Sequence, residues 1–154
     1  MTTACERILT VSNLKTYFRT PDGIVRAVDD VSFHLNRGEV LALVGESGCG
    51  KSVTAHSIMG LVKAPPAKLE GSIVFDCREL IGLSSSEYRK IRGMQISMVF
   101  QEPMSSFSPL FKIGSQIAEP IRLHITKDKK KAKELAINAM REVGISNPEE
   151  RYSQ

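Results

Sequence analysis

The 154-residue chain is 42% hydrophobic and 25% charged, which is ordinary for a globular domain with a core of its own. Its formal net charge of +4 is spread along the sequence, so no nucleic-acid-binding face is expected, and no apolar run approaches the roughly 20 residues of a membrane span. Three widely spaced cysteines argue against a disulfide framework or a zinc site and favour a reducing cytosol.

The amino-terminal part of the chain predicts two strands joined by a tight turn. Residues 8–14 alternate imperfectly between apolar and polar side chains, residues 21–23 read Pro-Asp-Gly, and residues 25–35 resume a strand pattern. In the second strand the apolar residues share one face, which places His34 on the exposed face and argues against a role for it as a ligand.

Residues 45–52 are the most informative stretch, because they fit the phosphate-binding pattern G-x-x-x-x-G-K-[ST] at every fixed position. Glycines let the backbone curl around an anion, and a helix that begins near Gly50 adds partial positive charge there. Lys51 is predicted to reach the β- and γ-phosphates of a nucleotide, and the Ser52 hydroxyl to bind Mg²⁺. The predicted nucleotide-binding residues of this segment are Gly45, Glu46, Ser47, Gly48, Cys49, Gly50, Lys51, Ser52 and Val53.

The flanks of this loop fit the strand–loop–helix arrangement that phosphate binding requires. Residues 39–44 form a short apolar segment of the buried parallel-strand type, and residues 53–62 are long enough for about three helical turns before Pro65-Pro66. A chance glycine-rich turn is therefore a poor explanation. The loop alone leaves nucleotide kinases, GTP switches and transport or motor ATPases open, but the 44 residues before it allow an additional antiparallel sheet.

Beyond the loop the predicted elements change from strands to helices. Residues 71–76 and 95–100 are predicted strands, the second of the buried type, and Ser84 and Glu87 have the spacing of a capping box that opens a short helix. The last third is predicted to be helical. Its expected apolar stripe, which Gly144 closes, consists of Leu135, Ala136, Ala139, Met140 and Val143.

Two further features of the last third concern its helix starts. Asn147-Pro148 can begin another helix near the carboxyl end. Residues 127–133 contain five lysines, and two interpretations of this run stay open. A solvated helix start is favoured, and a contact with anionic lipid headgroups is the alternative.

In combination these motifs resemble the ATP-binding subunits of ABC transporters over about residues 7–152. The resemblance is carried by residues 13–18 (Asn-Leu-Lys-Thr-Tyr-Phe), 27–33 (Ala-Val-Asp-Asp-Val-Ser-Phe), 38–39 (Gly-Glu), the loop, 71–75 (Gly-Ser-Ile-Val-Phe) and 98–103, which is similar to the family's Q-loop. Residues 101–106, Pro109, Ile113-Gly114 and His124 are most similar to the dipeptide/oligopeptide and nickel importer branch.

The resemblance implies an α/β fold with a P-loop NTPase (RecA-like) core. An ABC-type antiparallel β subdomain and this core would occupy about residues 7–100, and the Q-loop with the start of a helical subdomain about residues 101–154. Phe18 matches the aromatic residue that stacks on adenine, with Tyr17 as second choice. Gln101 matches the glutamine that contacts Mg²⁺ and the attacking water, so Lys51 and Gln101 are the implied catalytic residues.

ATP and Mg²⁺ are the cofactors that the resemblance implies. The implied partners are transmembrane permease subunits, docked on residues 104–143, and a second ATP-binding subunit in a homo- or heterodimer. The implied location is peripheral, on the cytoplasmic face of the cell membrane.

The chain departs from the family pattern at one residue and in the motifs that it includes. Cys77 stands where the family usually has glycine, so a positive φ there would strain the backbone. The family's signature motif, Walker B strand and switch histidine are expected beyond Gln154, which predicts a truncated domain. Residues 73–76 resemble a Walker B strand, but they follow the phosphate-binding loop too closely for the family's order of motifs. Two function classes result: the ATPase subunit of a peptide importer, and a nucleotide-binding remnant or regulatory fragment without turnover.

Overall fold

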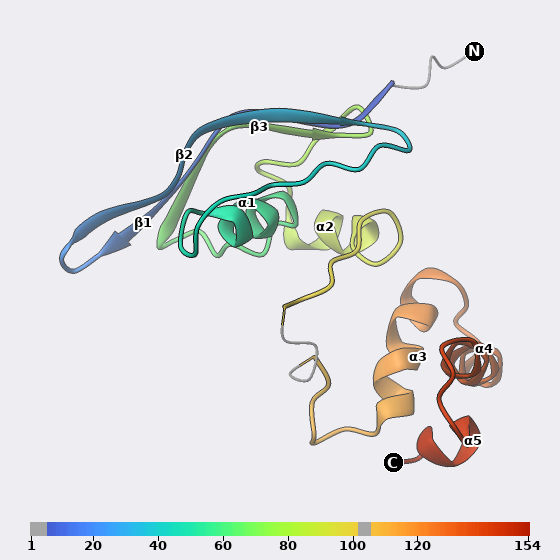
Figure 1. Ribbon diagram of the computed structural model, residues 1–154. Coiled ribbons are helices and arrows are strands. Elements are labelled where there is room, and N and C mark those ends of the chain that lie inside the picture. Colours follow the sequence, from blue (N-terminus) through green and yellow to red (C-terminus); the bar gives the residue numbers. More distant parts are fainter. Residues whose placement is uncertain (1–5, 102–105) are drawn as a thin grey trace. The chain divides into compact units, whose positions relative to one another are not determined.

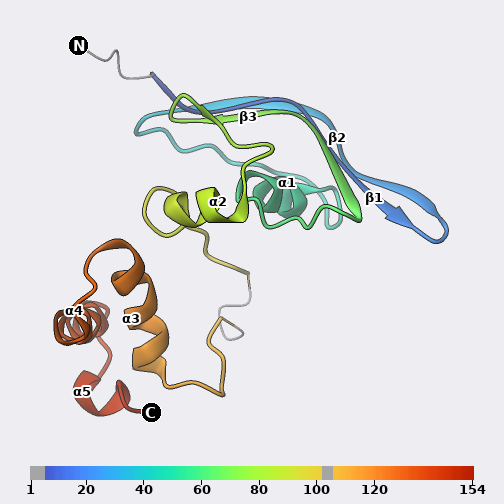
Figure 2. The ribbon, with the colours of Figure 1, turned by 180° about the vertical axis from the view of Figure 1, so that it is seen from behind.

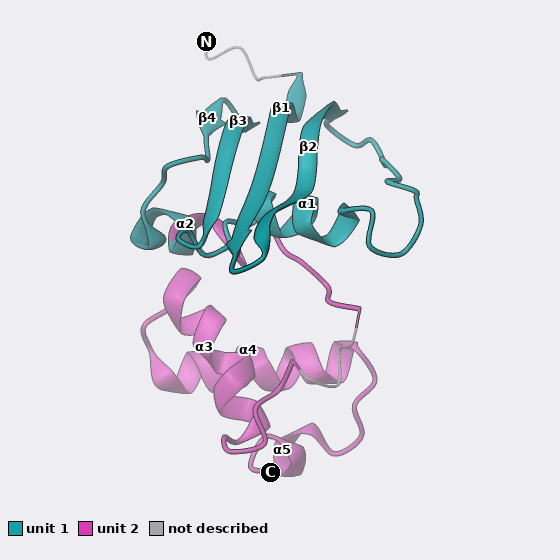
Figure 3. Ribbon diagram, turned by 90° about the vertical axis from the view of Figure 1, so that its left-hand side faces the viewer, with its two compact units in different colours: residues 1–89 teal, residues 90–154 magenta. Residues whose placement is uncertain are grey.

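A computed structural model describes residues 6–101 and 106–154. The chain divides into two compact units, with the boundary between Arg89 and Lys90 (Figure 3). The first unit contains β1 (Arg7–Thr20), β2 (Gly23–Asn36), α1 (Lys51–Ile58), β3 (Ala67–Phe75), β4 (Arg78–Glu79) and most of α2 (Ser85–Ile91). The second contains α3 (Ile113–His124), α4 (Lys129–Glu142) and α5 (Pro148–Arg151).

The first unit is built on an antiparallel sheet with the strand order β2-β1-β3-β4. The long β1–β2 hairpin closes at the pair Thr20↔Gly23, which confirms the predicted turn at residues 21–23. Both predicted strands are confirmed, and His34 is exposed as expected. Val11, Leu14, Ile73 and Leu80 supply the most deeply buried apolar side chains of this unit.

One face of the sheet carries α1, as Figures 1 and 2 show from opposite sides. The contact is polar at its centre: the hydroxyl oxygens of Thr16 in β1 and Ser57 in α1 lie 2.9 Å apart, and both side chains are fully buried. Ser57 also donates to the Val53 carbonyl at 2.7 Å, so the hydrogen-bonding groups are satisfied inside the protein. This pair fixes the position of α1 on β1.

The helix after the loop is shorter than the sequence predicts. It spans eight residues and ends at Ile58, whereas the prediction extended it to residue 62. Gly60 takes φ +60°, which ends the helix, and a Cβ atom there would lie 2.3 Å from the ring of Tyr88 in α2. The glycine therefore makes room for Tyr88, a packing requirement that the local sequence does not reveal.

The two predicted buried strands at residues 39–44 and 95–100 are wrong as strands. Neither segment joins the sheet, and Ile96 forms only a single isolated bridge, to Arg92. Val40, Val44 and Val99 are 94%, 90% and 90% exposed. A parallel strand needs neighbours from distant parts of the sequence, and the residues that the structure describes provide none for these segments.

The β3–β4 turn confirms the strain expected at Cys77. Asp76 and Cys77 both have positive φ, +45° and +63°, between the paired residues Phe75 and Arg78. Residues 73–75 pair antiparallel with β1, as predicted in place of a magnesium-binding strand. Cys77 is disulfide-bonded, although the odd number and wide spacing of the cysteines argued against a disulfide framework.

The second unit confirms a helical last third but changes its apolar stripe. Ala132, Ala136 and Met140 of α4 are buried, whereas Ala139 and Val143 are exposed. The buried face repeats strictly every four residues, one position away from part of the predicted stripe. Gly144 follows the end of α4 with φ +78°, and Asn147 is the N-cap of α5, so both predicted boundaries are confirmed.

The predicted capping box is also confirmed. The Ser84 backbone N–H donates to Glu87 Oε2 at 2.9 Å, and the Glu87 N–H donates to Ser84 Oγ at 3.3 Å. In the described parts of the chain, no helix is long and apolar enough to cross a membrane.

Candidate functional site

The last glycine of the predicted phosphate-binding loop, Gly50, lies close against β2. Gly48 and Gly50 have φ values of +82° and +96°, which side chains rarely allow. A Cβ atom on Gly50 would lie 2.3 Å from the carbonyl oxygen of Ala27. Gly50 is therefore required twice, by its backbone conformation and by its contact with the neighbouring strand.

The start of α1 supplies hydrogen-bond donors to the loop. Gly50 is its N-cap, and the N–H of Thr54 donates to the Gly50 carbonyl at 2.8 Å as the first bond of the helical ladder. The N–H groups of residues 51–53 precede that bond and have no acceptor within the helix. Together with the helix dipole they favour an anion at this end of α1.

Lys51 lies over the loop that precedes it. Its Nζ donates to the carbonyl oxygens of Gly45 and Glu46, both at 2.7 Å, and lies 3.4 Å from Cys49 Sγ. The ammonium group is thus held against the loop backbone by two neutral carbonyl acceptors. A phosphate oxygen, which carries negative charge, is a better acceptor for it than a neutral carbonyl.

A cavity of about 390 Å³ adjoins the loop within the first unit. Cys49, Gly50 and Lys51 line it from the loop, and the remaining lining residues are Arg26, Ala27, Val28, Asp29, Val31, Leu43, Val44 and Thr54. The cavity therefore brings the first residues of α1 together with one stretch of β2 and with residues 43–44, and its volume lies in the range of small-ligand pockets.

Asp29 at the edge of this cavity is already paired. Arg26 Nη1 lies 3.7 Å from Asp29 Oδ2, and the Tyr17 hydroxyl donates to Oδ1 of the same carboxylate. That hydrogen bond to Asp29 is the largest influence that raises the pKa of Tyr17, because it stabilises the protonated phenol. Arg26 and Asp29 were missed in the sequence, since nothing in their spacing indicates that β2 borders the loop.

Phe18 and Tyr17 lie on opposite faces of β1. The β1–β3 register is continuous from Thr16 to Phe18, so Phe18 shares the face on which Thr16 contacts α1, and Tyr17 faces the other way. Neither ring lines the cavity beside the loop. Tyr17 contacts the lining residue Asp29 through its hydroxyl, and the choice of Phe18 as the ring that stacks on adenine stays a prediction.

The remaining predicted site residues are Ser52, Val53 and Gln101. Ser52 is exposed in the first turn of α1, and Val53 is half-buried beside it. Gln101 is exposed and belongs to the second unit, and its role at the phosphates stays a prediction. Residues 102–105 of the predicted Q-loop lie outside the described residues.

The predicted metal ligand beside the loop is the hydroxyl oxygen of Ser52. Among residues 6–101 and 106–154, no group of three or more His, Cys, Asp or Glu side chains could hold a metal ion. Ser52 lies in the first turn of α1, at the amino-terminal end, where a bound phosphate would provide further oxygen ligands. This arrangement fits Mg²⁺, which commonly takes few protein ligands and shares substrate phosphates.

Comparison with known proteins identifies relatives along nearly the whole chain. Residues 28–154 match the family profile described as "ABC transporter". The oligopeptide transport ATP-binding protein AppD of Bacillus subtilis (strain 168) is 46% identical over 144 residues, which are 93% of this chain and 44% of AppD. The dipeptide transport ATP-binding protein DppD of the same organism is 46% identical over 150 residues, covering 97% of this chain and 45% of DppD.

The chain spans less than half of the length of these curated relatives. Among solved structures, the dimeric bacterial ABC transporter cassette MJ0796 is similar with a TM-score of 0.76 and 22% identity, over 95% of this chain and 60% of the cassette. A dimeric post-hydrolysis state of MJ0796, bound to ADP and Pi, gives a TM-score of 0.74 at 20% identity, over 94% of this chain and 60% of that one. These two similarities establish the fold.

Proposed function

The chain belongs to the ABC transporter family, and from that premise we propose that residues 45–52 bind the phosphates of Mg-ATP in the ATP-binding subunit of a peptide importer. The observation that carries the proposal is the geometry of the loop: Gly50 fits against Ala27, α1 begins at the loop, and Lys51 donates to the loop backbone. Relatives that are 46% identical are named for oligopeptide and dipeptide transport, which supports peptides as the transported class.

The proposed binding reaction needs a small movement within the loop. The Lys51 ammonium exchanges its bonds to the Gly45 and Glu46 carbonyls for bonds to the β- and γ-phosphates. The first amides of α1 donate to the same phosphates, and the Ser52 hydroxyl holds Mg²⁺, which neutralises phosphate charge. Phe18 stacks on adenine, and Gln101 orients the attacking water once it approaches the phosphates.

The proposed partners are permease subunits and a second ATP-binding subunit. Exposed apolar side chains follow the predicted Q-loop: Leu110 and Phe111 are 86% and 65% exposed, and Phe107 is 47% exposed. Such a concentration of exposed apolar residues favours a protein interface over a solvated loop. The similar cassettes are dimeric, which supports a paired subunit, and both partners would place the chain peripherally on the cytoplasmic face of the membrane.

For the 154-residue chain we propose nucleotide binding with little hydrolysis. The residues assigned to the site would bind the phosphates, Mg²⁺ and the adenine ring. None of them is assigned as the general base that takes a proton from the attacking water. A nucleotide-binding regulatory fragment without turnover is the second candidate. The exposed apolar segments at residues 39–44 and 95–100 support this candidate only on the condition that no other strands pair with them when the chain acts.

The test is thermal stabilisation of the chain by Mg-ATP. We expect a rise in melting temperature that saturates with Mg-ATP and is absent in Lys51→Ala. Lys63→Ala is the matched control, because Lys63 is an exposed lysine outside the loop and its replacement removes the same charge as Lys51→Ala. No stabilisation of the wild-type chain, or equal stabilisation of Lys51→Ala, would contradict the proposed site.

Hydrolysis is measured on the same preparations. We expect phosphate release at or near the background of Lys51→Ala. Robust turnover by the wild-type chain that Lys51→Ala removes would show that these 154 residues contain a complete catalytic site, against the proposal.

A further inference from the structure

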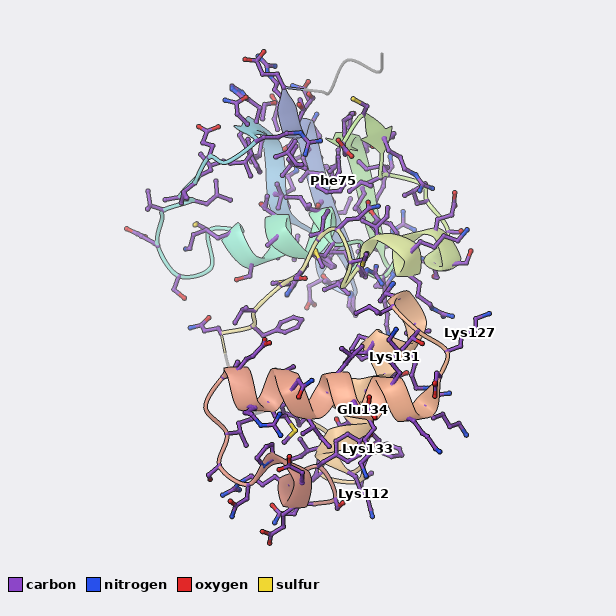
Figure 4. All side chains as sticks on the ribbon, turned by 90° about the vertical axis from the view of Figure 1, so that its right-hand side faces the viewer. Phe75, Lys112, Lys127, Lys131, Lys133 and Glu134 are labelled. Carbon is purple, nitrogen blue, oxygen red and sulfur yellow. The ribbon has the colours of Figure 1, made fainter. Side chains whose placement is uncertain are left out.

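The corner between α3 and α4 concentrates positive charge. Lys127 precedes α4, and Lys129, Lys130 and Lys131 form its first turn; all four side chains are exposed. None of them has an ion-pair or hydrogen-bond partner for its ammonium group among the described residues. Figure 4 shows Lys127 and Lys131 beside the first half of α4.

This placement opposes the stability of α4. The amino-terminal end of a helix carries partial positive charge, and acidic residues are favoured there. The first turn of α4 contains no acidic residue and three lysines. Asp128 is the N-cap, and its side chain accepts from the Lys130 N–H at 2.8 Å, so its carboxylate is already engaged with the helix backbone.

The fifth lysine of the run has a different environment. Lys133 Nζ lies 5.4 Å from the centre of the Tyr152 ring, so a cation–π contact ties it to the packing of the second unit. The other four lysines have no such contact with an aromatic ring among the described residues. The distinction separates one structural lysine from four that are available to a ligand.

Two exposed apolar side chains closely precede the lysines in the sequence. Leu123, near the end of α3, is 57% exposed, and Ile125, its C-cap, is 64% exposed. Large apolar residues next to unpaired lysines are typical of surfaces that meet a lipid headgroup layer, where the apolar groups enter the interface and the cations contact anionic headgroups. We define Leu123, Ile125, Lys127, Lys129, Lys130 and Lys131 as the lysine corner.

We propose that the lysine corner binds the surface of a bilayer that contains anionic phospholipids. Charge complementarity selects an anionic surface, and the two exposed apolar side chains select a lipid interface over a nucleic acid or a free anion. No residue of the corner is among the residues proposed to bind the nucleotide, and the loop belongs to the first unit whereas the corner belongs to the second. Lys51→Ala should leave it unchanged.

The test is co-sedimentation of the 154-residue chain with vesicles of phosphatidylcholine, alone or mixed with phosphatidylglycerol. We expect binding only to the mixed vesicles, and weaker binding as salt rises. The triple variant Lys129→Gln, Lys130→Gln, Lys131→Gln should weaken it about 100-fold, from the typical contribution of a lysine near an anionic membrane. Leu123→Ser with Ile125→Ser should weaken it at every salt concentration.

The matched control is Lys63→Gln, Lys90→Gln, Lys112→Gln, which removes the same charge from exposed positions elsewhere. It should lower vesicle binding far less than the corner triple, with circular dichroism confirming that both variants keep their helices. Equal losses in the two triples, or no binding to mixed vesicles at low salt, would overturn the proposal. Binding to polyglutamate without binding to mixed vesicles would assign the corner to an acidic protein, and would overturn it as well.

Discussion

The antiparallel sheet and the apolar segments at residues 39–44 and 95–100 have similar side chains but different environments. In the sheet, Leu14 and Ile73 are fully buried and each strand pairs with its neighbour. In the apolar segments, Val40 and Val99 are 94% and 90% exposed. Hairpins find their partners nearby in the sequence, whereas parallel strands depend on distant ones. A hydrophobic pattern therefore predicts a strand only together with its partners.

The largest expected effect compares the two regions directly. Leu14→Ala removes a fully buried side chain from the sheet and should lower the free energy of unfolding by about 2–5 kcal/mol. Val40→Ala shortens an apolar side chain that is 94% exposed and should change it by less than about 0.5 kcal/mol. Urea unfolding monitored by circular dichroism measures both. A large loss in Val40→Ala would mean that residues 39–44 are buried in solution.

The link between the sheet and the loop helix should give a smaller loss. Ser57→Ala leaves the buried Thr16 hydroxyl without its partner and should cost about 1–3 kcal/mol. Adding Thr16→Val removes the orphaned hydroxyl and should restore part of that loss. A double-mutant cycle in urea checks the coupling, and additive losses would show that the two hydroxyls do not interact.

The β3–β4 turn should be stabilised by glycine. Cys77→Gly relieves the positive φ of +63° and should raise the free energy of unfolding by about 1 kcal/mol under reducing conditions, where the disulfide is absent. Cys77→Ala loses the same thiol but keeps the strain, so it should give no gain. Equal stability of the two variants would place the turn outside the left-handed region in solution.

The smallest expected effect lies outside the sheet, at the start of α2. Hydrogen bonds from the Ser84 N–H, and next from its hydroxyl, hold the pKa of Glu87 below the ordinary value of a glutamate. A lowered folded-state pKa stabilises the protein above the unfolded pKa, and this contribution disappears as the pH falls through the folded value. Glu87→Gln should therefore reduce stability near neutral pH, and by less at about pH 3, which lies below the ordinary pKa of a glutamate.

Urea midpoints at the two pH values measure this difference. Glu134→Gln is the control, because Glu134 has no hydrogen-bond or ion-pair partner among the described residues. A Glu87→Gln loss that is the same at both pH values would assign the effect to side-chain packing, against the charged capping box.

How far the sequence predicts the molecule depends on whether the determinant is local. The turn at residues 21–23, the capping box at Ser84 and the helix boundary at Gly144 were predictable, because each rests on a few adjacent residues. The left-handed glycines of the loop and the helix that follows them were predictable from the G-x-x-x-x-G-K-[ST] pattern. The early end of α1 and the place of Arg26 beside the loop were not, because they depend on Tyr88 packing and on the docking of β2.

The most direct test of the account is hydrogen exchange of the 154-residue chain with and without Mg-ATP. The account predicts slow exchange in β1, β2 and β3, fast exchange in residues 39–44, and new protection at residues 45–53 when Mg-ATP is added. Protection of residues 39–44 equal to that of β1, or no gain at residues 45–53 at saturating Mg-ATP, would contradict it.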